Sequence, residues 1–167
     1  QKSADYTIKL EGAQPVGFRT ISIAGIRAPD LIQQLDNVLE AVRYRVFANF
    51  ESIDPSEAQL LFRVYGQNGV MGDLEPYTDQ RPHEVGLVIE VVAKTQSLAD
   101  TVCSFARSTL LHFGYPGRQS TAGNLAFPYS PSDISHGVVY EFSVYHLMIV
   151  DDPVSPFPMR IQNLGTV

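Results

Sequence analysis

The sequence predicts an α+β domain, with a four-stranded antiparallel sheet and two helices on one face of it. Two segments carry apolar residues at the spacing of an amphipathic helix, and four segments have the alternation or β-branched composition of strands. The chain has 167 residues, of which 44% are apolar, so it is long enough for one domain with a sizeable core. We therefore expect a single domain over residues 1–167.

The first main strand is expected at residues 17–26, GFRTISIAGI, where β-branched and aromatic side chains dominate. Residues 6–11 alternate moderately and could form a short leading strand. Gly12 and Pro15 should separate that short strand from the main one, because both residues interrupt regular strands.

A helix should follow this strand. Pro29 suits the first helical position, and Asp30 is favourable at the positive end of the helix dipole. Apolar residues then recur in one stripe with the 3.6-residue period, at Leu31, Ile32, Leu35, Val38, Leu39, Val42 and Val46. This stripe predicts a helix that packs one side on the sheet.

Two further strands are expected to pair as a hairpin. In residues 58–65, AQLLFRVY, apolar positions alternate with a set that includes Arg63 and Tyr65. In residues 84–93, EVGLVIEVVA, Leu87, Ile89 and Val91 lie on one face, and Val88, Glu90 and Val92 lie on the other.

The last helix and strand are predicted after residue 96. Ser97 followed by Asp100 resembles a capping box, and Gly114 with Pro116 is typical of a helix end. The apolar stripe of this helix comprises Leu98, Val102, Phe105, Ala106, Thr109, Leu110 and Phe113. Residues 137–150, GVVYEFSVYHLMIV, predict an unusually long final strand.

The predicted order is strand, helix, strand, strand, helix, strand, which is the ferredoxin-like split βαβ pattern (βαββαβ). Two helices bury only one face of such a sheet. The other face should carry Arg63, Tyr65, Glu90, Glu141, Ser143 and Tyr145. That face needs a partner domain, a partner subunit or a ligand, or it is solvated.

Charge and apolar patterning exclude several classes of partner. The net charge is −6 and the 12 basic residues are dispersed, so we expect no nucleic-acid binding. The apolar runs are shorter than the ~20 residues that cross a bilayer, so we expect no membrane span. Cys103 is the single cysteine and lies on a helical stripe, which indicates a buried thiol and favours the cytoplasm.

The histidines predict no metal centre. Their spacing matches no ligand pattern, and one cysteine cannot complete a site. His112 at a helix end and His146 in a strand suit structural roles, whereas His83 and His136 lie in loops. We therefore expect no metal and assign no catalytic residue.

The candidate ligand-binding residues lie in two loops. Residues 121–134, TAGNLAFPYSPSDI, form a long connection with embedded apolar residues, and such loops often carry binding groups. Its candidates, with the preceding arginine, are Arg118, Thr121, Asn124, Ser130 and Asp133. These groups could instead hold their own loop together.

The second loop follows the strand at residues 58–65. Arg63, Gln67 and Asn68 place one cation and two amides near the end of that strand. Such a set could hold a carboxylate or phosphate, and it could equally bind another chain.

Long phrases of the sequence resemble the C-terminal part of the acyclic terpene utilisation (AtuA) family. They cover nearly the whole chain and are GFRTISIAGIRAPDLI, FRVYGQNGVMG, HEVGLVIEVVA, FARSTLLHFGYPGR, TAGNLAFPYSPSDI and YEFSVYHLMIVDDP. The resemblance implies a role in the catabolism of citronellol- and geraniol-type compounds through CoA thioesters, so a CoA thioester is an implied ligand. It also implies a larger N-terminal domain before this chain, which agrees with the polar start that lacks Met. It brings no agreed catalytic residues.

Three functional hypotheses follow. The domain could complete a ligand site or interface with the N-terminal domain of the same protein or with another subunit. It could instead be a non-catalytic oligomerisation module that packs through its open sheet face. A small-molecule-sensing module is a third hypothesis, which rests on fold analogy alone.

Overall fold

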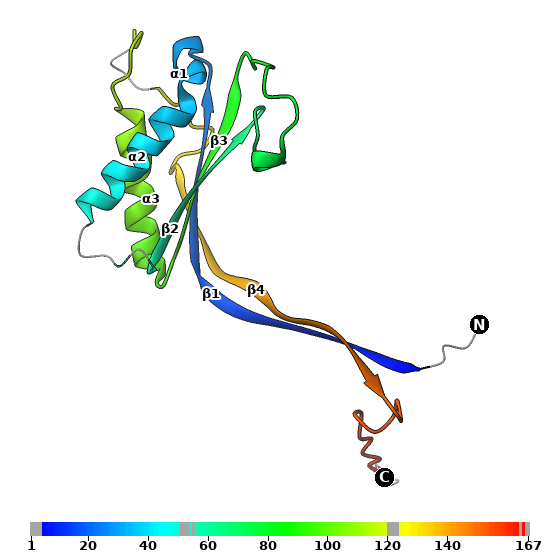
Figure 1. Ribbon diagram of the computed structural model, residues 1–167. Coiled ribbons are helices and arrows are strands. Elements are labelled where there is room, and N and C mark those ends of the chain that lie inside the picture. Colours follow the sequence, from blue (N-terminus) through cyan, green and yellow to red (C-terminus); the bar gives the residue numbers. More distant parts are fainter. Residues whose placement is uncertain (1–4, 51–53, 55, 120–123, 164, 166–167) are drawn as a thin grey trace. The chain divides into compact units, whose positions relative to one another are not determined.

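The computed structural model describes residues 5–50, 54, 56–119, 124–163 and 165 (Figure 1). The described elements form a four-stranded antiparallel sheet with the helices packed on one side. The strand order is β2-β3-β1-β4, with β1 at Tyr6–Ile26 and β4 at Asp133–Val150. This order is that of a ferredoxin-like sheet and confirms the predicted fold class.

The chain divides into two compact units. One unit, Val16–Val139, holds the helices, β2, β3 and those parts of β1 and β4 that fall within these bounds. The other unit comprises Gln1–Pro15 and Tyr140–Val167. The ferredoxin-like core therefore belongs to Val16–Val139.

Strand β1 is continuous from Tyr6 to Ile26, so the expected interruption at Gly12 and Pro15 is wrong. The paired residues of β1 and β3 begin at Phe18, so Pro15 lies where β3 does not pair with β1. A proline, which lacks an N–H, is tolerated at such an edge. Gly17 has a φ of +152°, and a Cβ there would lie 2.6 Å from the Ala93 carbonyl oxygen, which explains the glycine.

The first predicted helix is split into α1, Pro29–Gln33, and α2, Leu35–Asn49. Gln34 between them leaves the helical conformation, with φ −120° and ψ 19°. Its Nε2 donates to the carbonyl oxygens of Asp30 at 2.6 Å and Pro116 at 3.0 Å. The apolar stripe nevertheless runs through both helices, because Leu31 before the break and Leu35 after it are both buried.

Strands β2, Ala58–Tyr65, and β3, Val85–Ala93, pair antiparallel as predicted. A segment with one 3₁₀ turn, η1 at Gly72–Leu74, connects them. Strand β3 is central, since it also pairs with β1. Its position explains why both of its alternating sets are largely apolar.

Helix α3, Gln96–Leu111, begins earlier than predicted. Thr95 is the N-cap, and its hydroxyl accepts from the Leu98 backbone N–H at 3.2 Å. The expected Ser97–Asp100 capping box is wrong, because the carboxylate of Asp100 bonds to Thr20 on β1 instead. The strand β4 also begins before Gly137, so residues 133 and 134 of the predicted loop are in the strand.

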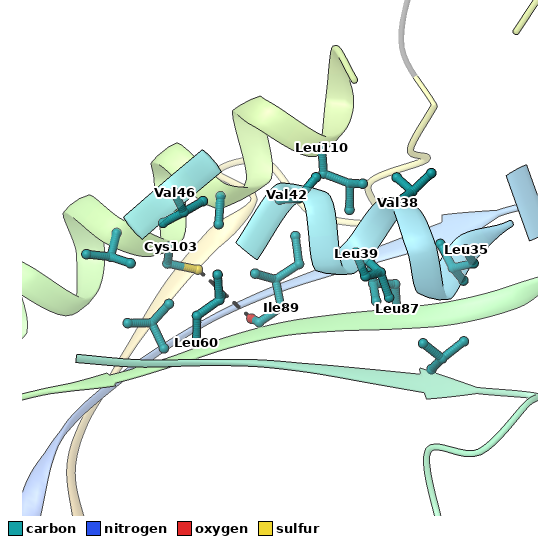
Figure 2. Close-up of a cluster of buried hydrophobic side chains, with 14 of the residues drawn as sticks. Leu35, Val38, Leu39, Val42, Val46, Leu60, Leu87, Ile89, Cys103 and Leu110 are labelled. Carbon is teal, nitrogen blue, oxygen red and sulfur yellow. Dashed lines mark hydrogen bonds between the residues drawn. The ribbon is translucent and has the colours of Figure 1, made fainter. Parts of the chain in front are cut away.

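The hydrophobic core lies between the helices and the sheet (Figure 2). Its fully buried members include Leu35, Val42, Leu87, Ile89 and Leu110. Cys103 is also buried, with its Sγ 3.9 Å from the Ile89 carbonyl oxygen. Burial raises the pKa of Cys103 to about 12, as expected for a thiol that packs among apolar core residues.

Candidate interaction surface on the open sheet face

The sheet of Val16–Val139 has one face covered by helices and one face that the described helices leave uncovered (Figure 1). Side chains alternate between the two faces along each strand. We call the uncovered side the open face. It is formed by Arg19, Ile21, Ile23, Leu61, Arg63, Tyr65, Val88, Glu90 and Val92.

Glu90 lies at the centre of the open face, opposite Ile21 on β1 and Leu61 on β2. Only 5% of this residue is exposed. Its Oε2 accepts a hydrogen bond of 2.8 Å from Arg63 Nε. Its Oε1 lies 2.8 Å from Arg19 Nε. These two groups form an ion pair, but their geometry is not that of a hydrogen bond. One buried carboxylate thus lies between two arginines.

The sheet register explains this cluster. Arg19 lies opposite Val92 and Arg63 lies opposite Val88, so each arginine is diagonal to Glu90 on a neighbouring strand. Diagonal neighbours on one face are about 7–8 Å apart, within reach of a long side chain. The two arginines approach from opposite flanks, and each carboxylate oxygen has its own guanidinium group.

The cluster carries one net positive charge, from two arginines and one glutamate. Among the described residues, Glu90 is the one side-chain partner of each guanidinium group. Each arginine contacts the Glu90 carboxylate through its Nε atom. The terminal nitrogens therefore remain as donors. Arg63 has 46% of its side chain exposed, so these donors can reach a carboxylate on another molecule.

Apolar side chains surround the cluster. Tyr65 is 46% exposed, whereas Ile21, Ile23, Leu61 and Val88 are partly exposed. Protein interfaces favour Arg and Tyr among their central residues, although other charged residues are depleted there. Of the residues predicted on this face, Arg63, Tyr65 and Glu90 are present. Glu141, Ser143 and Tyr145 belong to the other unit.

Two predicted ligand-binding residues, Arg118 and Asn124, meet at the C-terminal end of α3. Asn124 Nδ2 donates to the carbonyl oxygen of Phe113 at 3.1 Å, and Arg118 Nη1 donates to the same oxygen at 3.2 Å. Arg118 also bonds to the His112 carbonyl oxygen at 2.9 Å. These side chains satisfy carbonyl groups that a helix end leaves free.

The structure separates Arg63 from the amides that were predicted to act with it. Gln67 and Asn68 line a cavity of about 390 Å³, whereas Arg63 bonds to Glu90. The lining of that cavity includes the carboxylates of Asp36 and Asp73. These carboxylates give the cavity an acidic lining. Gln67 Nε2 donates a long hydrogen bond of 3.4 Å to Asp36 Oδ2.

The remaining predicted residues lie apart from these. Asp133 Oδ1 pairs with Arg107 Nε at 2.7 Å on the helix-covered side. Ser130 is exposed and precedes Pro131 through a cis peptide bond. Thr121 lies outside the described residues. The seven candidates that the structure describes thus do not form one constellation.

Sequence reasoning missed Arg19, because an arginine in a strand with apolar neighbours is usually a solvated residue. The signal that could have found it is Glu90, a lone charge in an otherwise apolar strand. Such a charge requires a partner when it is buried.

A cleft of about 820 Å³ also lies within Val16–Val139. Polar groups in its lining include Arg27, Asp30, Tyr115, Gln119 and Asn124. In the part of the chain that the structure describes, no three His, Cys, Asp or Glu side chains form a metal-binding group. No described helix has the length and apolar character to span a membrane.

Comparison with protein-family models, curated proteins and solved structures gives no match.

Proposed function

We propose that this chain is the docking domain of an AtuA-like protein of acyclic terpene catabolism. Its open face binds the N-terminal domain of the same protein or another subunit. The observation that carries the docking role is the Arg19–Glu90–Arg63 cluster, with its buried carboxylate and its partly exposed arginine side chains. The family assignment rests on the sequence phrases alone.

Packing of the sheet alone does not explain the cluster. A buried carboxylate is costly unless it is paired, and replacement of a buried ion pair by apolar residues is often neutral or stabilising. The neighbours of Glu90 across the sheet are Ile21 and Leu61, so an apolar residue at position 90 would pack well. A role in recognition would account for the choice of charged residues, rather than apolar ones, at this place.

Charge indicates what the partner presents. The cluster has one net positive charge although the chain as a whole has a charge of −6. A carboxylate within an apolar patch would pair with the terminal nitrogens of Arg63 and bury Tyr65 beside it. A second copy bound face to face would oppose two positive clusters, so this face favours a different surface.

Binding between this chain and the separately produced remainder of its protein tests the docking role. Arg63→Glu should weaken binding by about 30-fold or more, because it removes the donors and reverses the charge. Arg45→Glu is the matched control, since Arg45 is exposed on α2. Isothermal titration calorimetry measures both, after circular dichroism has shown that each variant is folded.

A second variant protects this test from a folding defect. Tyr65→Asp places a charge at an exposed position of the same face and leaves Glu90 paired. Wild-type affinity in both Arg63→Glu and Tyr65→Asp would rule out docking through the open face.

The family assignment has its own test. Deletion of the gene in the source organism should stop growth on citronellol as sole carbon source and leave growth on acetate unchanged. Equal growth on both compounds would contradict a role in terpene catabolism.

A second candidate function is binding of an acyl or CoA-type ligand in the cleft of about 820 Å³. This volume lies within the range of small-molecule sites, about 300–1,000 Å³. Arg27 is an exposed residue of its lining and could pair with a ligand carboxylate or phosphate. Titration with acetyl-CoA should show binding that Arg27→Ala weakens, and no heat at millimolar ligand would exclude this function.

A further inference from the structure

The cleft of about 820 Å³ lies at one end of β1 and β3. Ile26 and Val85 form the pair at that end of the two strands, and both are buried residues of the lining. Arg27 and Glu84 are each the next residue beyond this pair, and both also line the cleft. A positive and a negative residue therefore lie at the same end of the sheet, next to two apolar side chains.

A third charged residue of the lining, Asp30, follows Arg27 by three positions. A segment of that length spans at most about 11 Å, so the two residues are near each other. Gly117 of the lining has a φ of +83°, and a Cβ there would lie 2.7 Å from Oδ2 of Asp30. The glycine therefore leaves room for the Asp30 carboxylate beside a turn that borders the cleft.

These three side chains carry the charges of the described lining, one positive and two negative. All three residues are exposed, and within the described ranges none of the three side chains has a hydrogen bond or an ion pair. Charged side chains at a protein surface are normally solvated. Here, however, both signs line one concave surface without pairing with each other, so a ligand that carries both signs could pair with both.

The rest of the lining is largely apolar. Leu125 and Tyr115 are partly buried residues of it, in addition to Ile26 and Val85. Small-molecule sites are typically apolar clefts in which a few polar groups orient the ligand. This lining fits a small ligand with a positive and a negative group at one end and an apolar remainder.

We infer that the cleft binds a free α-amino acid with an apolar side chain. The ligand carboxylate pairs with Arg27, as in the second candidate function, on which this inference rests. The ligand ammonium group pairs with Asp30 or Glu84, and the apolar side chain lies against Leu125 and Tyr115. An acyl ligand without an amino group leaves both acidic residues without a partner.

Isothermal titration calorimetry of the chain with four compounds tests the inference. L-Leucine and L-phenylalanine should bind. Their analogues 4-methylpentanoate and 3-phenylpropanoate lack only the amino group and should bind at least about tenfold more weakly, because one charge-assisted contact is lost. Arg27→Ala should weaken binding of both amino acids by about tenfold or more, since it removes the partner of the carboxylate.

The double variant Asp30→Asn/Glu84→Gln removes both partners of the ammonium group. It should weaken binding of L-leucine by about tenfold and leave binding of 4-methylpentanoate no weaker than in wild type. A folding defect would instead weaken binding of both compounds. Asp79→Asn is the matched control, because Asp79 is exposed and lies outside the cleft lining.

Three results would overturn the inference. Equal affinity for L-leucine and 4-methylpentanoate is the first, and it would leave the second candidate function in place. Wild-type affinity of the double variant for L-leucine is the second. The third is no binding of either amino acid at about 10 mM, after which titration with acetyl-CoA decides the second candidate function on its own.

Discussion

The hydroxyl group of Thr20 on β1 donates a 2.5 Å hydrogen bond to Oδ1 of Asp100 on α3. The same oxygen accepts from Gln96 Nε2 at 2.9 Å and from Ser135 Oγ at 2.8 Å. Gln96 Oε1 in turn accepts from the Gly137 backbone N–H at 3.1 Å. One carboxylate therefore joins β1, α3 and β4, and holds the edge strand to the core.

The Asp100 contacts predict acid sensitivity. The hydrogen bond from Thr20 lowers the pKa of Asp100 below its ordinary value of 3.8, against the opposing effect of burial. A folded-state pKa below the unfolded one stabilises the fold above pH 3.8, and this contribution is lost as the pH falls through the folded pKa. Urea denaturation at about pH 7 and about pH 3 should show a smaller acid-induced loss of stability in Asp100→Asn than in wild type. Equal losses would contradict this role.

Removal of Glu90 should destabilise the open face. Loss of one member of a fully buried ion pair costs about 3–5 kcal/mol. The side chains of Arg19 and Arg63 are 33% and 46% exposed, so solvent screens the charges left behind. We expect Glu90→Ala to lower the free energy of unfolding by about 1–2 kcal/mol in denaturant titrations. Exposed Glu141→Ala is the control, and an equal effect of both variants would refute a special role for Glu90.

Asn124 should contribute to stability through the end of α3. Its amide group bonds to the carbonyl oxygens of Phe113 and Leu110, at 3.1 and 3.4 Å. Asn124→Ala should therefore lower the unfolding free energy by about 1 kcal/mol. Ser130→Ala, at an exposed position, should leave it unchanged. Thermal unfolding measures both, and wild-type stability of Asn124→Ala would return this residue to the ligand-binding hypothesis.

The core under the helices should be sensitive to truncation. Leu87 on β3 has no exposed surface, so Leu87→Ala should cost about 2–5 kcal/mol of unfolding free energy. Leu74 is 79% exposed, and Leu74→Ala should stay within about 0.5 kcal/mol of wild type. Guanidinium titration compares the two. A loss below about 1 kcal/mol at Leu87 would contradict its central place in the core.

Much of the fold could be predicted because its signals are local. The strand at Ala58–Tyr65 has the predicted bounds, and the stripe from Leu31 to Val46 packs on the sheet as predicted. The break at Gln34 could not be predicted, because its amide group bonds to Pro116, which is distant in sequence. The capping box failed for the same reason, since Asp100 bonds to Thr20 instead.

The candidate ligand site was predicted from residue type and loop length, and these do not tell how a polar group is used. Arg118 and Asn124 bond to carbonyl groups of α3, and Asp133 pairs with Arg107. A loop rich in donors and acceptors has the same composition whether it binds a ligand or stabilises its own structure.

The sequence by itself determined which segments are helices and strands, and through their order the ferredoxin-like sheet, because apolar periodicity depends on near neighbours. Only the tertiary structure decided the use of the polar residues. The contact between Arg63 and Glu90 spans 27 positions and that between Thr20 and Asp100 spans 80. Such pairs form when the sheet register and helix packing bring the residues together, and no local pattern in the chain encodes them.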